Sequence, residues 1–224
     1  MGHLIIKIDK NEIWQKQRSK GIGGSDCASV LGLNPYKTNI ELWREKTGRK
    51  KKENIDNKPY VIYGKKAEEH LRGLFSLDYP EFEIIHSPYN IHYNPNKEYI
   101  RASLDGELFF NKQNNNNVIK GIWEGKTSEI RQLSDWKKWD GQIPMNYFCQ
   151  ILHYFAIDED YKFAYLTAQI KHKDKTGEIV KTTRNYKILR KDYLSDIEYL
   201  IKEEEKFWRY VETDEEPPLI LPKI

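Results

Sequence analysis

The stretch GIWEGKTSEI, residues 121–130, has the composition of a β-strand and holds an acidic and a basic residue two positions apart. Because strand side chains alternate between the faces of a sheet, Glu124 and Lys126 point to one face and Trp123 points to the other. A salt bridge on a solvated strand face would also explain this pair, since acid-x-Lys triplets are common by chance. The residues around the strand must therefore decide what the pair does.

A second β-type run, YIRASLDGELFF at residues 99–110, is predicted to form an antiparallel hairpin with residues 118–128, with the polar run 114–117 as the turn. Asp105 and Glu124 are equidistant from the middle of that turn, so they should face each other across the ladder. Opposed carboxylates repel unless positive charge lies between them. Mg²⁺, which prefers oxygen ligands, would supply that charge, and a pair of solvated acids is the alternative.

Lys126 favours the metal site over the solvated pair. Its ammonium projects from the same face as Glu124 and is placed to orient or deprotonate a water that attacks a phosphodiester. The histidines show no ligand spacing, and we expect each to be structural or on the surface. They are His70, His86, His92, His153 and His172, with His3 near the terminus.

Length and composition indicate one domain with a sizeable core. The chain has 224 residues, of which 38% are hydrophobic and 13% aromatic. Its formal charge of +3 permits nucleic acid as a partner without requiring it. Basic residues cluster in REKTGRKKK, residues 44–52, which is either a solvated loop or a surface that faces phosphate.

The two cysteines are too few for a disulfide framework or a four-cysteine metal site, and they are typical of a reducing compartment such as the cytoplasm. The N-terminal segment holds only three consecutive apolar residues before charge resumes. No later apolar run approaches the length of a membrane span. We expect a cytoplasmic protein without membrane association.

Helical and strand-like periodicities alternate along the chain, which predicts an α/β fold. The strands between residues 81 and 127 are expected to form a small antiparallel sheet, and Ser25 is predicted to cap a short apolar helix. The expected helices cover 10–19, the stretch after Ser25, 39–47, 61–77, 143–157 and 191–211, and the expected strands lie within 81–93, 99–110, 118–128, 163–173 and 182–190.

Several motifs resemble known nucleases. Asp105 followed by Glu124-Gly125-Lys126 resembles the Asp…Glu-x-Lys pattern of the PD-(D/E)xK superfamily. RSKGIGGSDCASVLGLNPYKTNIELWREKTGR, from Arg18, resembles the opening motif of the YqaJ-type viral recombinase family, relatives of bacteriophage lambda exonuclease. The similarity continues in family order through YGKKAEEHL, RASLDGEL, WEGKTS and IPMNYFCQILHYFAI, and chance agreement of five ordered motifs is improbable.

The resemblance implies roles for the residues of the hairpin. Asp105 and Glu124 would be ligands of Mg²⁺, with Mn²⁺ as a substitute, and the carbonyl of Gly125 would join them. Lys126 would position the attacking water.

Two residues on expected helices complete the catalytic set that the resemblance implies. Glu68 matches the helix acid that supports the metal site, with Glu69 as a rival for the same role. Gln150 matches a glutamine that orders the site. From the residues alone, both Glu68 and Gln150 would be read as surface polar groups.

Arg18 and Ser25 stand seven positions apart, the spacing at which related exonucleases hold a 5′ phosphate. An Arg fork and a hydroxyl at a helix N-terminus suit a phosphate, and Gly21, Gly23 and Gly24 would let backbone amides approach it. The alternative is that Ser25 only caps its helix and that Arg18 is solvated.

We expect one nuclease domain over residues 1–224, with an N-terminal helical segment at about 9–50 and a C-terminal helix at about 191–211. The resemblance spans about residues 9–160 and implies a PD-(D/E)xK core of central mixed sheet flanked by helices, while the strands and the helix after residue 160 contain no motif of the family. The implied activity is Mg²⁺-dependent 5′ to 3′ degradation of one strand of linear duplex DNA, giving 3′ tails for recombination. Alternatives are a structure-selective or restriction-like endonuclease, or a DNA-binding recombination accessory without catalysis.

The implied partners are double-stranded DNA ends, a single-strand annealing protein and further copies of the chain in a ring-shaped trimer. The implied location is the cytoplasm of a bacterial or virus-infected cell.

Overall fold

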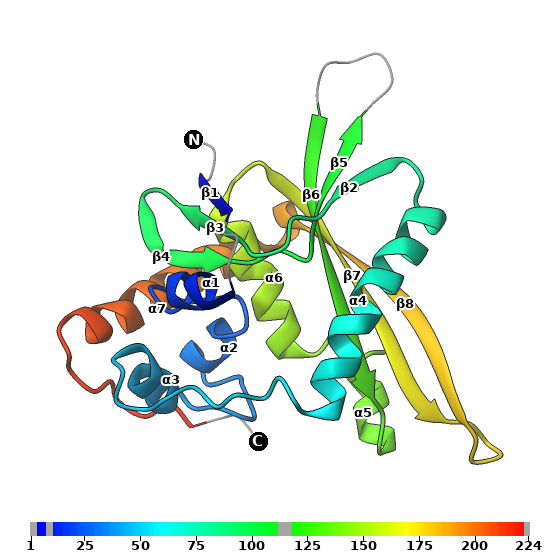
Figure 1. Ribbon diagram of the computed structural model, residues 1–224, viewed down its shortest axis with the longest axis horizontal. Helices are drawn as coiled ribbons and strands as arrows, with labels where there is room; N and C mark the ends of the chain where they lie inside the picture. Colours follow the sequence, from blue (N-terminus) through cyan, green and yellow to red (C-terminus); the bar gives the residue numbers. More distant parts are fainter. Residues whose placement is uncertain (1–3, 8–10, 112–117, 222–224) are drawn as a thin grey trace.

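The computed structural model describes residues 4–7, 11–111 and 118–221, so the predicted turn at 114–117 lies outside the described residues (Figure 1). The helices are α1 (Asn11–Arg18), α2 (Cys27–Val30), α3 (Asn39–Lys46), α4 (Pro59–Asp78), α5 (Leu133–Lys137), α6 (Met145–Ile157) and α7 (Leu194–Glu212), with a 3₁₀ turn η1 (Arg190–Tyr193) before α7. The strands are β1 (Leu4–Lys7), β2 (Phe82–Ile85), β3 (Asn90–Asn94), β4 (Lys97–Ala102), β5 (Gly106–Asn111), β6 (Val118–Glu129), β7 (Tyr161–Lys173) and β8 (Ile179–Leu189).

The central sheet has the order β2-β5-β6-β7-β8. It is mixed, because β6 pairs antiparallel with β5 and parallel with β7, while β7 and β8 form a long antiparallel hairpin. The parallel step is made by the crossover through α5 and α6, as a parallel connection requires. The predicted α/β class and the mixed sheet flanked by helices are confirmed.

The expected single antiparallel sheet over residues 81–127 is wrong. Each of the runs 81–93 and 99–110 is divided between two sheets, because β3 and β4 pair with β1 in a separate three-stranded sheet. The Asn90 side chain satisfies the backbone at this division: Nδ2 donates to the Leu104 carbonyl at 3.1 Å, and Oδ1 accepts from the Leu104 N–H at 3.0 Å. The chain can therefore leave one sheet for the other without burying unpaired peptide groups.

The predicted register of the central hairpin is confirmed. Gly106 lies opposite Trp123, and the pairing continues without a shift to Asn111 opposite Val118. Asp105 is the residue just before β5, so it approaches Glu124 from the end of the strand and not from within the ladder.

Helices cover both faces of the central sheet (Figure 1). On one face Trp123 packs with Phe75 of α4, and on the other Ile122 packs with Phe155 of α6. All four side chains are at most 1% exposed, and each contributes about 1.5–3 kcal/mol by its burial. Because Glu124 has the parity of Ile122, the sheet turns its carboxylate towards α6.

The N-terminal helical segment is joined to the three-stranded sheet and to the end of the chain. Ile22 donates to the Tyr99 carbonyl at 2.7 Å and forms a parallel bridge with Ile100. Residues 213–221 form a C-terminal strap across α3, where Asn39 donates to the Pro218 carbonyl at 2.8 Å. Asn39 Oδ1 accepts from the Ile220 N–H at 3.0 Å, so one side chain fixes the strap in both directions.

In the described part of the chain, no helix combines the length and the apolar character that crossing a bilayer requires.

Candidate active site

A cavity of about 540 Å³ lies between α1, the turn before α2, α4, α6 and the adjoining ends of β5 and β6. The ten predicted site residues all line this cavity, although they are spread over 133 positions of sequence order. They are Arg18, Gly23, Gly24, Ser25, Glu68, Asp105, Glu124, Gly125, Lys126 and Gln150. Gly21 and Glu69 are not among the lining residues.

Glu124 lies at the centre of the cavity wall and is only 1% exposed. Its Oε1 accepts from Lys126 Nζ at 2.5 Å and from Gln150 Nε2 at 2.7 Å. Its Oε2 is buried without a hydrogen-bond partner. A buried carboxylate oxygen without a partner costs free energy, and a bound cation would remove that cost.

Asp105 is held at the mouth of the hairpin by three contacts. Its Oδ2 accepts from the Gly125 N–H at 3.1 Å, which links the two residues predicted to share a metal. Its main-chain carbonyl accepts from Arg72 Nη1 at 2.6 Å and from His86 Nδ1 at 2.9 Å. Arg72 and His86 were not predicted, and the position of Arg72 one helical turn after Glu68 was the available signal.

Gly125 has no space for a side chain. A Cβ would lie 2.8 Å from Trp123 Cη2 and 3.5 Å from Glu68 Cγ. Its N–H points towards Asp105, and because the N–H and C=O of one strand residue point to the same edge, its carbonyl points to the Asp105 side beyond the end of β5. The predicted carbonyl ligand therefore lies on the Asp105 edge of β6.

This ligand set suits a hard cation with retained waters. Among the described residues, no group of three or more His, Cys, Asp or Glu side chains is arranged to hold a metal, so a metal would depend on Asp105, Glu124 and the Gly125 carbonyl. Two carboxylates and further oxygen ligands are the usual protein contribution to a Mg²⁺ site.

The electrostatics of the cavity favour added positive charge. Burial, and next the charge of Asp105, raise the pKa of Glu124 to about 8 against the opposing effect of Lys126. Burial and Asp105 likewise raise the pKa of Glu68 to about 7, against Arg72. Burial acts to lower the pKa of Lys126, but the charges of Glu124 and Asp105 outweigh it, and the pKa is raised.

Tyr154 lies between the glycine-rich turn and the carboxylate side of the cavity, which consists of Asp105 and Glu124. Its hydroxyl accepts from Gln150 Nε2 at 2.5 Å and donates to the Ser103 carbonyl at 3.4 Å. A Cβ on Gly24 would lie 2.5 Å from Tyr154 Cε1 and 3.0 Å from Gln150 Cγ. Sequence analysis missed Tyr154, whose position one helical turn after Gln150 was the signal.

The structure corrects two expectations about the glycine-rich turn. Ser25 does not cap α2: the helix begins at Cys27, Asp26 is the N-cap residue, and its side chain makes no capping bond. Asp26 Oδ2 instead accepts from Lys46 Nζ at 2.7 Å and from the Gly23 N–H at 3.1 Å. The Gly23 amide is therefore already used, while Ser25 is exposed and lines the cavity.

Arg18 lies on the same side of the cavity, with its guanidinium 4.5 Å from the centroid of the Trp14 ring. Stacking on an aromatic ring orients the planar fork but leaves its N–H groups available to an anion.

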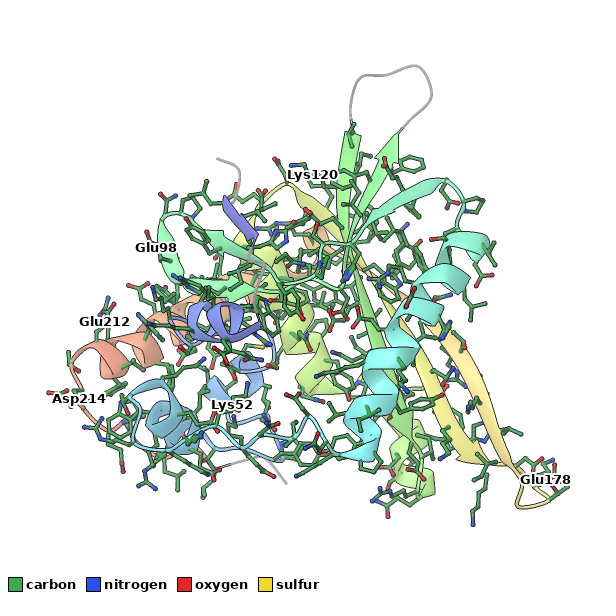
Figure 2. The ribbon with its side chains drawn as sticks, in the orientation of Figure 1. Lys52, Glu98, Lys120, Glu178, Glu212 and Asp214 are labelled. Carbon is green, nitrogen blue, oxygen red and sulfur yellow. The ribbon has the colours of Figure 1, made fainter. Side chains whose placement is uncertain are left out.

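The basic run at 44–52 proves to be divided in role. Arg44, Arg49 and Lys50 form ion pairs with Glu216, Asp214 and Glu41, and Lys46 pairs with Asp26. Lys52 instead lines the cavity, on the segment between α3 and α4 (Figure 2). Burial lowers the pKa of Lys52 against the effect of Asp26, and the charge of Arg18 adds to the lowering.

A family model described as the YqaJ-like viral recombinase domain matches residues 13–167. The chain belongs to this family. The matched range contains every predicted site residue, and β8 and α7 lie beyond it.

One relative resembles the chain over most of the length of this chain. The YqaJ protein of Bacillus subtilis (strain 168) is 31% identical over 163 residues, which cover 70% of this chain and 46% of that protein. The chain thus spans about half the length of this curated relative.

Two solved structures share the fold of this chain. They are an alkaline exonuclease (LHK-Exo) from Laribacter hongkongensis and LHK-Exo in complex with dAMP. Each has a TM-score of 0.60 and 14% identity, and the match covers 91% of this chain and 94% of LHK-Exo. At this identity the likeness establishes the fold.

Proposed function

We propose that this protein is a metal-dependent deoxyribonuclease that degrades linear duplex DNA from its ends. One observation carries the proposal: Glu124, with one buried oxygen unpartnered, lies beside Lys126 in a cavity that Arg18 also lines. A cation site next to an anion site matches the needs of phosphodiester hydrolysis. The shared fold with an alkaline exonuclease and the family membership support the same class of reaction.

The residues of the chain divide the chemistry between them. Asp105, Glu124 and the Gly125 carbonyl would hold the metal, which when bound would supply positive charge at the scissile phosphate and lower the pKa of a bound water. Lys126 is held by Glu124 and lies 5.2 Å from the Tyr147 ring centroid, and its proposed role is to orient the attacking water. Gln150 fixes the Glu124 carboxylate through a hydrogen bond, and Glu68 lines the same cavity and would support the metal site.

The proposed direction of degradation rests on the anion side of the cavity, which consists of Arg18, Ser25 and Lys52. Arg18 and the exposed Ser25 hydroxyl would hold a terminal 5′ phosphate, with Lys52 adding charge, so the proposed polarity is 5′ to 3′ with 3′ single-stranded tails as product. A ring-shaped trimer around the duplex and an annealing protein that receives the tails are parts of this proposal that rest on the family resemblance.

The test is digestion of end-labelled linear duplex and of closed circular duplex with Mg²⁺. Release of mononucleotides from linear DNA alone is the expected result. Cleavage of the closed circle would establish the endonuclease alternative in its place. DNA binding without cleavage of either substrate would instead indicate a non-catalytic recombination accessory.

A further inference from the structure

Tyr89 is an exposed aromatic residue with a disfavoured backbone on the rim of the catalytic cavity. Its φ is 55°, in the left-handed region that a residue with a Cβ rarely adopts, and it remains 41% exposed. Glycine or asparagine would hold this turn more easily. A bulky ring kept in such a position indicates that the ring itself has a use.

Trp14 places the Tyr89 ring in line with the anion side of the cavity. The Trp14 indole N–H lies 3.1 Å from the Asn90 carbonyl and 3.2 Å from Ser103 Oγ, which fixes the ring plane. Its centroid lies 5.7 Å from that of Tyr89, in an edge-on arrangement, and 4.5 Å from the Arg18 guanidinium. Tyr89, Trp14 and Arg18 therefore form a row along one wall of the cavity.

The chemistry of this row is that of a nucleotide site. A guanidinium binds phosphate, and exposed aromatic rings stack on bases of any sequence because every base has a π-face. Asp105 and Glu124 line the same cavity, and Trp14 links Arg18 to Tyr89, so a strand end whose phosphate contacts Arg18 would bring its base to the Tyr89 side.

We propose that Tyr89, supported by Trp14, is the stacking site for the base of the 5′-terminal nucleotide. This inference rests on the proposed nuclease function, and it adds a binding group that acts without reading sequence. Tyr89 would position the strand end before cleavage and would raise kcat/KM through the base and not through the phosphate.

The experiment compares linear duplexes that carry either a normal or an abasic 5′-terminal nucleotide. For the parent protein, loss of the base should lower kcat/KM about fivefold to a hundredfold. Tyr89→Ala should lose the same factor on the normal end and should no longer distinguish the two ends, whereas Tyr89→Phe should behave as the parent. Tyr36→Ala, at an 89% exposed tyrosine outside the cavity, is the matched control.

A binding measurement separates this inference from the proposed function. A duplex with 2-aminopurine as its 5′-terminal base, bound without Mg²⁺, should lose fluorescence with the parent and with Tyr89→Phe but not with Tyr89→Ala. 2-Aminopurine at the 3′ end should respond equally to all three proteins. If the parent cleaves DNA but Tyr89→Ala keeps both the discrimination and the quenching, the stacking site is wrong. If no protein cleaves, the nuclease proposal fails while the quenching still reports on the base site.

Discussion

At the scale of single residues, the central feature of the cavity is a carboxylate whose ionised form is disfavoured by burial. Glu124 is nearly inaccessible, carries a raised pKa and keeps one oxygen without a partner. Such an arrangement is unfavourable for the metal-free protein and favourable for a cation, which is how a binding site differs from a well-packed core.

Glu124→Gln should abolish cleavage without lowering the stability of the metal-free protein. The folded pKa near 8 lies above the ordinary value near 4.5, so ionisation of Glu124 removes stability as pH rises between these values. Gln does not ionise, and the variant should gain on the parent by at most about 1.4 kcal/mol per pH unit in that window. Urea unfolding at pH 5 and pH 8 measures this difference in stability.

Asp105→Asn should also abolish cleavage, whereas Glu69→Gln, the control, should cleave as the parent does. Cleavage by Glu124→Gln or by Asp105→Asn would contradict the assigned site.

Arg18→Ala should remove the preference for phosphorylated 5′ ends. A terminal phosphate gains charge-assisted hydrogen bonds that a hydroxyl cannot make, and their loss should cost about 1.5–3 kcal/mol, a tenfold or larger drop in rate. Rates on hydroxyl ends should stay nearly unchanged. Initial nucleotide release at fixed salt measures both, because phosphate contacts elsewhere depend on salt. Equal rates on the two ends in the parent would remove the phosphate site and strengthen the endonuclease alternative.

At the scale of secondary-structure elements, the turn before α2 and helix α6 meet without an intervening side chain. Gly24 lies directly against Gln150 and Tyr154, so the anion side and the carboxylate side of the cavity are in contact through α6. The separation between the two sides is thereby fixed by packing and not by a flexible loop.

Gly24→Ala should therefore separate α6 from the turn, destabilise the protein by about 1–3 kcal/mol and lower nuclease activity. Gly73→Ala is the matched control, because a Cβ at Gly73 in α4 meets nothing within 4 Å and should stabilise the helix by about 0.5–1 kcal/mol. Thermal unfolding and initial rates on linear duplex measure the pair. An unchanged Gly24→Ala variant would show that the turn yields freely.

Elements with a local pattern could be predicted from the sequence, and elements set by distant partners could not. The hairpin register followed from strand parity and the turn, and α6 followed from its apolar spacing. The division of the strands into two sheets depends on Asn90 bonding to Leu104, and the role of Asp26 depends on Lys46, twenty positions later. No periodicity within either segment records these partners.

At the scale of the whole molecule, the candidate site is supported by a buried ion pair whose acidic partner lies outside the matched family range. His153 of α6 bonds through Nδ1 to Glu204 of α7 at 2.6 Å and through Nε2 to the Arg101 carbonyl at 2.9 Å. Because the Arg101 carbonyl can only accept, Nε2 carries a proton. His153 was expected to be structural or on the surface, and its partner, which is 51 positions away, could not be predicted.

His153→Gln should destabilise the protein by about 3–5 kcal/mol near pH 6, since it leaves Glu204 buried without its cation. Burial opposes the shift, but Glu204 raises the pKa of His153 above its ordinary value near 6.5. The stabilisation is therefore complete below about pH 6.5 and is lost as pH rises through the higher folded pKa. The deficit of the variant should shrink at alkaline pH in urea unfolding. Lys206→Gln, which breaks an exposed pair on α7, should barely change stability at any pH.

The C-terminal strap has a consequence for how the chain folds during synthesis. Asn39 binds backbone groups 179 and 181 positions later, so the segment around α3 receives its partners only after Pro218 and Ile220 have left the ribosome. The hairpin of β5 and β6 closes within a few residues and can form early. A nascent chain would thus acquire the strands that bear Glu124 and Lys126 before the segment that carries Lys46 and Lys52 is secured, and the two halves of the cavity would mature in sequence.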